Sequence, residues 1–334
     1  MPRMYKPSPG SDVRRAARLV MAVLSLSACG QQDGIIGAQP AVGGATGTGG
    51  VAGAAGMAGA AGVAPTPTYR TDFDATEAGW QSQTPLTNAR TSFGVPIAGA
   101  GAPITAEVRL PGHPEYAATA KVGARFATQI GSARVFGFGR FRTRLRFGVC
   151  RPNEDAVNAA LGYFSDGGDE NQNGLTDDEE IDFQVLCGTP HRVFLTVFTD
   201  YQVADSGAEQ FLKLSRVIDF GTGEVFDTPA PDQDAFTKQP TVPGFVHPEL
   251  FASDGLYVVG FEWHATSLRF FLEVDGAEQT LWTLSDPARI PQHPVTFLYN
   301  VWHPDTHWYP ATGAAAYPAQ DVVMRPDWFE FYEE

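Results

Sequence analysis

The 334-residue chain has 38 acidic and 23 basic residues, a formal net charge of -15, and three cysteines. Because nucleic acids and anionic lipids attract basic surfaces, this balance excludes a nucleic-acid partner and disfavours docking of the folded part on a lipid headgroup layer. An uncharged polysaccharide or oligosaccharide is compatible with it.

The first 28 residues have the features of a bacterial lipoprotein signal peptide. A positively charged start precedes the apolar run 19–28, which is too short to span a bilayer and ends in the lipobox sequence Leu-Ser-Ala-Cys. We therefore expect cleavage before Cys29 and lipidation of its thiol, so that acyl chains alone anchor the protein to the membrane. The alternative is an ordinary secretory signal. Gly30 stands where Asp would signal inner-membrane retention, which favours the outer membrane, on either its periplasmic or its outer side.

Residues 29–68 form a segment rich in Gly, Ala, Thr and Pro, with almost no charge. Such a composition cannot bury enough apolar surface to offset its ordering entropy, so we expect a flexible linker. Removal of residues 1–28 leaves 18 basic and 37 acidic residues, a formal charge of about -19. The remaining stretch, 69–334, has the length of one globular domain, which we expect to be monomeric.

The pattern of this domain is almost entirely that of β-strands. Arg140–Phe147 alternates strictly, with Arg at every second position, so one face is apolar and the other is solvated. Asp275-Gly276 is a type I′ hairpin signal. Many strands with frequent Gly and Pro turns indicate a β-sandwich or jelly roll. The further strands expected are 158–164, 191–199, 255–263, 268–274, 295–302 and 328–332.

Residues 169–180 match the spacing of a twelve-residue calcium loop. Hard oxygen ligands with Gly174 at the bend are what Ca²⁺ needs, and the absence of flanking helices implies a loop between strands. The alternative is a solvated acidic hairpin. The expected ligands are Asp169, Asn171, Asn173, the Leu175 carbonyl and Asp177, with position 12 at Glu180 or, by our preference, at the neighbouring Glu179.

The stretch 179–186, Glu-Glu-Ile-Asp-Phe-Gln-Val-Leu, alternates as a strand. Its odd positions 181, 183 and 185 are apolar and belong in a core. Glu180, Asp182 and Gln184 lie on the opposite face. Two carboxylates at adjacent positions of one face repel each other, which raises the pKa of one of them. Such a pair of carboxylates suits a catalytic nucleophile with a neighbouring helper group, and it also suits the base of a sugar-binding cleft.

Glu180-Ile-Asp182-Phe-Gln184 resembles the active-site strand of glycoside hydrolase family 16, above all the xyloglucan-active branch, which has Glu-Ile-Asp-Phe-Glu. The stretches 137–141 and 158–164 resemble the strands that precede it. The resemblance implies an all-β, concanavalin A-like jelly-roll sandwich with a concave sugar-binding cleft. It places Glu180 at the nucleophile, Asp182 at the helper and Gln184 at the acid/base position of a retaining glycosidase or transglycosylase that acts on a β-glucan-like polysaccharide.

Gln184 departs from the family pattern, because an amide cannot protonate a leaving oxygen. Loss of general acid catalysis typically costs about 10²–10⁴-fold in rate. Two hypotheses follow from this. One is a glycoside hydrolase with Glu180 as nucleophile, aided by a substitute acid such as Asp166 or Asp200. The other is a catalytically silent lipoprotein that binds glycans or a partner.

The aromatic residues around 302–309 are candidates for stacking on sugar rings. The family resemblance implies that Trp302 and Trp308 line subsites, with Phe164 as a further substrate contact. Trp302 has the alternative of being a core residue. A metal site at His303 and His307 is disfavoured, because Pro304 argues against the helix that their spacing would need.

Cys150 and Cys187 remain as a pair once Cys29 is assigned to the lipid. In an oxidising compartment we expect them to form a disulfide, with two buried thiols as the alternative.

Overall fold

The structure is a computed structural model, and it describes residues 65–75, 79–83, 90–97, 103–112, 127–203, 209–233, 235–251, 255–304, 306–309 and 313–334. The signal sequence, Cys29 and nearly all of the expected linker lie outside these residues. Within them, none of the helices has the length and apolar character needed to cross a membrane.

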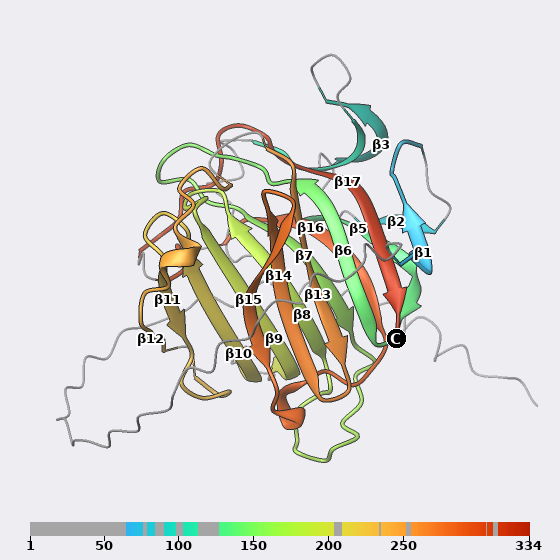
Figure 1. Cartoon of the computed structure of the whole chain (residues 1–334), viewed down its shortest axis with the longest axis vertical. Helices are drawn as coiled ribbons and strands as arrows, with labels where there is room; N and C mark the ends of the chain where they lie inside the picture. Colours follow the sequence, from blue (N-terminus) through green and yellow to red (C-terminus); the bar gives the residue numbers. More distant parts are fainter. Residues whose placement is uncertain are drawn as a thin grey trace, which may run out of the picture.

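Two antiparallel sheets face each other and form a β-sandwich of the jelly-roll class (Figure 1). This is the all-β fold class expected from the sequence. The first sheet has eight strands in the order β15 (Ala277–Leu284), β14 (Ser267–Val274), β13 (Tyr257–His264), β6 (Gly139–Arg146), β17 (Val322–Glu333), β4 (Ile104–Leu110) and β3 (Arg90–Pro96), with β1 (Tyr69–Thr71) also paired to β17.

The second sheet has nine strands, and β8 lies at its centre. Their order is β12 (Thr237–Lys238), β11 (Glu224–Asp227), β10 (Glu209–Asp219), β9 (Arg192–Val203), β8 (Glu179–Leu186), β7 (Val157–Phe164), β16 (Val295–Trp302), β5 (Ala127–Phe136) and β2 (Trp80–Gln83). The helices described are two short 3₁₀ turns, η2 (Pro243–Phe245) and η3 (Pro287–Arg289).

The main core lies between the two sheets and is rich in aromatic rings. Phe141 of β6 stacks on Phe261 of β13 at 4.6 Å between ring centroids, and Phe297 of β16 meets Phe329 of β17 at 4.5 Å. Burial of such large apolar side chains is the dominant favourable term in folding. Ile181, Phe183 and Val185 of β8 belong to this core, which confirms that the odd positions of the strand face inward.

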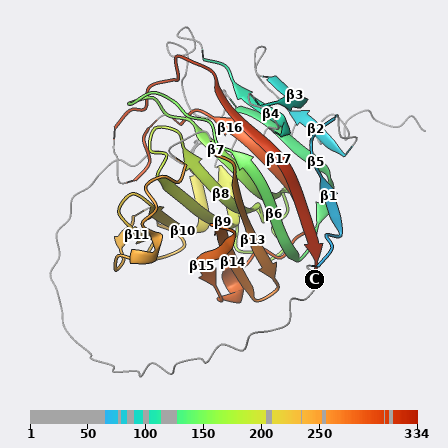
Figure 2. The same cartoon turned by 45° about the horizontal axis from the view of Figure 1, so that its top comes forward.

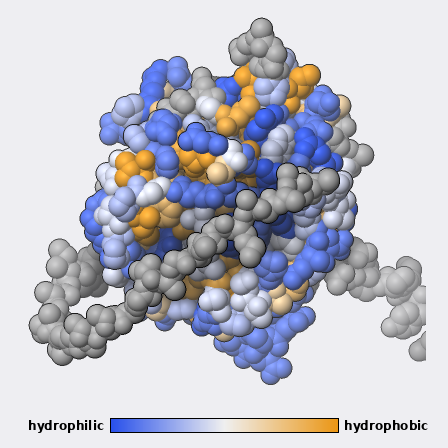
Figure 3. Space-filling model, in the orientation of Figure 1, coloured by the Kyte–Doolittle hydropathy of each residue, from blue (hydrophilic) through white to orange (hydrophobic). Residues whose placement is uncertain are grey.

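The alternation on β6 is also confirmed, since its inner residues are buried and its arginines are partly exposed on the outer face. Arg140, Arg142 and Arg144 pair with acids on other strands of the same sheet. Arg142, for example, bonds to Glu273 at 2.8 Å and to Glu330 at 3.1 Å. Hydrophilic residues surround smaller hydrophobic patches on the face seen in Figure 3.

The turn between β14 and β15 has the conformation expected from the sequence. Asp275 and Gly276 connect β14 to β15 with φ of 54° and 77°, the backbone that a type I′ turn requires. β1 lies beside the end of β17, with Tyr69 opposite Phe331 (Figure 2).

Several strands were not expected from the sequence, notably β10 and β15, each of which pairs with the strand before it in the chain.

Candidate active site

The outer face of the nine-stranded sheet, directed away from the main core, presents the acidic row of β8. Glu180 and Asp182 are 4% and 1% exposed, and Gln184 is 9% exposed. The even positions of the strand point away from the main core because the odd positions belong to it. We refer to this surface, carried by β7, β8, β9, β10 and β16, as the acidic face.

Burial and mutual repulsion govern the charge state of the two carboxyl groups. Burial raises the pKa of Asp182 to about 8, although the neighbouring Glu180 and Lys213 act in the opposite direction. Burial, reinforced by Asp182 and Asp178, raises the pKa of Glu180 well above its usual range. The pair therefore retains a proton at neutral pH, as expected for two carboxyl groups that share one site.

Gln184 contacts this pair directly. Its Nε2 donates to Oδ2 of Asp182 at 3.3 Å. Across the sheet, Gln184 lies opposite Phe194 of β9 and Ala159 of β7. The position that resembles the family's acid/base residue is therefore an amide that is hydrogen-bonded to the Asp182 carboxyl group.

Three further residues of the acidic face are missed by reasoning from the sequence. Tyr163 lies opposite Glu180 in the β7–β8 register, and burial followed by the charge of Asp178 raises the pKa of its hydroxyl. Lys213 of β10 lies opposite Phe198, which itself lies opposite Glu180. Asp178 is 9% exposed directly before β8. Asp178 could have been placed on this face from the sequence, because it lies two positions before Glu180 and side chains alternate along a strand. Tyr163 and Lys213 could not, because their positions depend on the register between strands.

Four polar atoms of this region are buried without a hydrogen-bond partner. Such groups cost roughly 1–3 kcal/mol each unless water or a ligand satisfies them. Two of them are carboxylate oxygens at the centre of the acidic face, where sugar hydroxyl groups could donate. The four unpartnered atoms are Asp178 Oδ1, Asp182 Oδ1, Asn300 Oδ1 and Trp308 Nε1.

An apolar cluster borders the acidic face at the Gln184 end. Trp302 and Trp308 meet at 5.7 Å between ring centroids, and Trp308 contacts Phe194 edge-on at 5.2 Å. Trp302 is 4% exposed and packs in this cluster with Leu186. The structure thus brings both tryptophans to the expected face, where Trp302 is a packed residue and Trp308 is partly exposed.

Phe164 lies elsewhere. It is opposite Glu179, and its ring packs on the main core and stacks on His293 at 4.3 Å. Because side chains alternate along β7, the residue that shares a face with Glu180 is Tyr163. Phe164 therefore does not lie on the acidic face, where the sequence placed it, and Tyr163 is the β7 residue on that face beside Glu180.

Glu179 is directed away from the predicted calcium loop. Its carboxylate accepts hydrogen bonds from the backbone N–H of Gln292 at 3.0 Å and of His293 at 2.8 Å, beyond the 3₁₀ turn η3. These bonds join the segment after η3 to β8. The structure therefore does not bring Glu179 together with the other expected calcium ligands.

The remaining loop residues are joined by internal hydrogen bonds. Asp169 accepts from the backbone N–H of Asn173 and Gly174, both at 3.0 Å. Asn171 and Asn173 donate to Asp200 at 2.9 and 2.7 Å, which adds an acid of β9 to the loop. Carboxylate and amide oxygens of this kind suit Ca²⁺, and the donor set would be Asp169, Asn171, Asn173, Asp177 and Asp200, with the Leu175 carbonyl.

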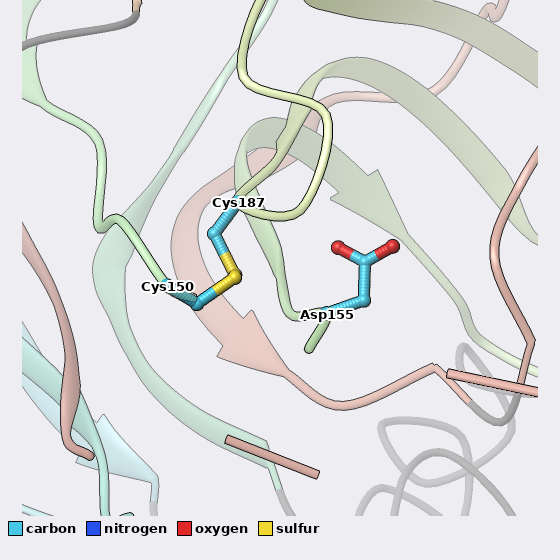
Figure 4. Close-up of side chains that lie close together, drawn as sticks. All are labelled: Cys150, Asp155 and Cys187. Atoms are coloured by element: carbon cyan, nitrogen blue, oxygen red, sulfur yellow. A yellow bond between two sulfur atoms is a disulfide. The ribbon is translucent and has the colours of Figure 1, made fainter. Parts of the chain in front are cut away.

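The expected disulfide is present, between Cys150 and Cys187, with 5.3 Å between their Cα atoms. Asp155 lies beside it (Figure 4). Because both sulfur atoms are in the disulfide, this group has no thiolate to offer a metal ion. The Asp155 carboxylate is fully buried and accepts from Nδ1 of His307 at 2.9 Å. His303 Nδ1 contacts the Asp155 carbonyl at 2.9 Å, so Asp155 orients both imidazoles near the tryptophan cluster.

Fold and site together define a β-sandwich that carries a buried row of carboxyl groups and bordering aromatic rings on one sheet face. No protein-family model matches the chain, and the comparison with curated proteins found no match. Among solved structures, the β-glucanase of Bacillus licheniformis is similar over 80% of this chain and 99% of its own, with 14% identity and a TM-score of 0.48.

Two other solved structures have comparable values. A β-1,3-1,4-glucanase (lichenase) from a mouse hindgut metagenome is 15% identical, with a TM-score of 0.45, over 80% of this chain and 99% of its own. The laminarinase catalytic domain of Thermotoga maritima is 12% identical, with a TM-score of 0.46, over 80% of this chain and 98% of its own. These are likenesses at low identity, and the fold class of this chain rests on its own two antiparallel sheets.

Proposed function

We propose that the acidic face binds a β-glucan-like polysaccharide and cleaves or transfers its glycosidic bonds with retention of configuration. The observation that supports this most directly is the row of Asp178, Glu180 and Asp182, three buried carboxyl groups side by side on one sheet face. Buried clustered acids with raised pKa values are typical of catalytic sites. The solved structures named above are glucanases, which agrees with this substrate class.

In this proposal Glu180 attacks the anomeric carbon in its ionised form, while Asp182 holds the single proton that the pair retains at neutral pH. The attack forms a glycosyl ester on Glu180 and breaks the glycosidic bond, while the leaving oxygen takes up a proton from water or from a substitute acid such as Asp166 or Asp200. Water or an acceptor sugar then displaces Glu180 and loses its own proton to that group or to solvent. Gln184 can hydrogen-bond the glycosidic oxygen but cannot supply that proton. Trp308, partly exposed with an unpartnered Nε1, would stack on a sugar ring and donate to a hydroxyl.

A second function is favoured by Gln184 itself. With the proton donor replaced by an amide, the same face would bind glycan without turning it over. In that case Asp182 Oδ1 and Asn300 Oδ1 would accept from sugar hydroxyl groups, and the carboxyl row would contribute recognition in place of chemistry.

The proposal includes an anchor and a metal, each of which rests on sequence spacing. Lipidation at Cys29 would hold the domain at the outer membrane, and a Cys29→Ser chain should then no longer partition with membranes. Calcium bound by the 169–177 loop would stabilise the segment that enters β8.

One experiment separates the two functions. The purified chain is incubated with a panel of β-glucans and xyloglucan, and both the release of reducing ends and equilibrium binding are measured. Release that disappears in Glu180→Gln supports the enzyme. Binding without release, abolished by Trp308→Ala, supports the binding protein. Absence of both would overturn the proposal.

A further inference from the structure

On the other sheet, the end of β6 lies beside the start of β17 (Figure 1). A hollow of about 210 Å³ opens there, and its two positively charged lining residues are Arg146 and Arg325. The other residues that line it are Phe147, Gly148, Val149, Asp321 and Val323. We refer to it as the Arg325 hollow.

The two arginines are direct neighbours across the strands, since Arg146 lies opposite Arg325 in the β6–β17 register. Like charges directly opposite each other destabilise an antiparallel pair. The other three arginines of the β6 row have no arginine opposite them on β17. Arg144 faces Trp328, Arg142 faces Glu330 and Arg140 faces Tyr332.

The carboxylates nearest to the hollow already have partners. Glu107 accepts from Arg109 Nε at 2.7 Å and pairs with Arg325 Nη2 at 2.8 Å. Asp321 accepts from the backbone N–H of Gly112 at 2.9 Å and is also paired with Arg109. The second terminal nitrogen of Arg325, Nη1, is buried and has no hydrogen-bond partner.

A buried guanidinium nitrogen without an acceptor is costly, and the acceptor that best matches a guanidinium fork is an oxyanion. The opposing Arg146 adds attraction for negative charge at the same point. Gly148 lies at the hollow with its backbone against β17, where a Cβ atom would come within 2.6 Å of Val322 Cγ1 and 2.9 Å of the Val323 nitrogen. The opening therefore depends on the absence of a side chain at that turn.

We propose that the Arg325 hollow binds an oxyanion, either as a free inorganic anion or as an acidic group carried on a glycan. Arg325 Nη1 and Nη2 hold the oxygen atoms, with Nη2 shared with Glu107, and Arg146 closes the site from β6. The hollow lies on the sheet that does not carry the acidic face, so binding there can be measured separately from binding at the proposed active site.

The test uses binding, measured by calorimetry and by the shift in melting temperature. The full chain is titrated at constant ionic strength with sodium sulfate, with glucuronate oligosaccharides and with neutral glucan oligosaccharides. Saturable binding of sulfate identifies a free anion, and binding of glucuronate oligosaccharides alone identifies a glycan-borne carboxylate. Neutral oligosaccharides should not compete for the hollow.

Variants assign the site. Arg325→Gln and Arg146→Gln should each weaken anion binding about tenfold or more. Arg325→Lys keeps the charge but loses the fork, so it should bind more weakly than the wild type. Arg144→Gln is the matched control from the same row, since it removes one charge outside the hollow and should leave affinity unchanged. Absence of saturable binding by any of these anions, or equal loss in Arg144→Gln, would overturn the inference.

Discussion

The side-chain amide of Gln184 donates to Oδ2 of Asp182 at 3.3 Å. This bond places an uncharged donor where a catalytic acid would be expected, beside an intact Glu180. Replacement by a carboxylic acid restores a group that can give and take a proton. We therefore expect Gln184→Glu to raise polymer hydrolysis by about 10²–10⁴-fold.

The matching substrate test uses an aryl glycoside with a good leaving group, which departs without protonation. The wild type should cleave it, and azide should accelerate the second step because an anionic nucleophile needs no base. Inert behaviour of both the wild type and Gln184→Glu on every glycoside, with binding retained, would leave only the glycan-binding function.

Glu179 and Glu180 are neighbours with opposite orientations, which provides a matched pair of variants. Glu180→Gln should abolish cleavage while glycan binding persists. Glu179→Gln should keep cleavage but weaken the contacts to Gln292 and His293, lowering the free energy of unfolding by about 1–3 kcal/mol. Steady-state kinetics and urea unfolding measure the two effects. Loss of activity in Glu179→Gln alone would contradict the assignment.

The buried carboxyl pair should make the protein less stable as the pH rises. The pKa of Asp182 is raised to about 8 by burial, so between about pH 4 and 8 the folded state binds more protons than the unfolded state. The contribution of Asp182 to the free energy of unfolding is therefore fully present below about pH 4, decreases as the pH rises, and is lost once the pH passes 8. Asp182→Asn should therefore raise the melting temperature at pH 8 more than at pH 5. An equal or larger gain at pH 5 would contradict the raised pKa of Asp182 in the folded state.

Calcium should raise the melting temperature by mass action if the 169–177 loop binds it. Asp169→Ala and Asp200→Ala should remove that response, because their carboxylates organise the loop from two sides. Asp232→Ala, an exposed acid outside the loop, is the control. Identical melting curves with calcium and with chelator would mean that the loop is an acidic hairpin.

The Cys150–Cys187 disulfide joins residues separated by 37 positions. In the chain-entropy model a loop of this length stabilises the fold by roughly 3–4 kcal/mol. The double variant Cys150→Ser/Cys187→Ser should lose that amount in denaturant unfolding, and alkylation of the native wild type should fail until it is reduced. Ready alkylation without reductant would contradict the bond.

Local periodicity was sufficient for the parts of this protein that depend on neighbouring residues. The alternation of 179–186 assigned Ile181 and Phe183 to the core and Glu180 to the opposite face, because side chains on a strand alternate whatever its partners are. The type I′ turn at Asp275-Gly276 was predictable for the same reason, since the positive φ of a two-residue hairpin is a local demand.

Tertiary structure decided everything that depends on register between strands. Phe164 and Tyr163 are adjacent in sequence, yet only the pairing of β7 with β8 shows that Tyr163 faces Glu180. The same holds for Glu179, whose bonds reach a backbone 113 positions away, and for Arg146 opposite Arg325. A shift of one residue in pairing reverses the face of every side chain, and that shift is fixed by packing of the whole sandwich and not by any short stretch of sequence.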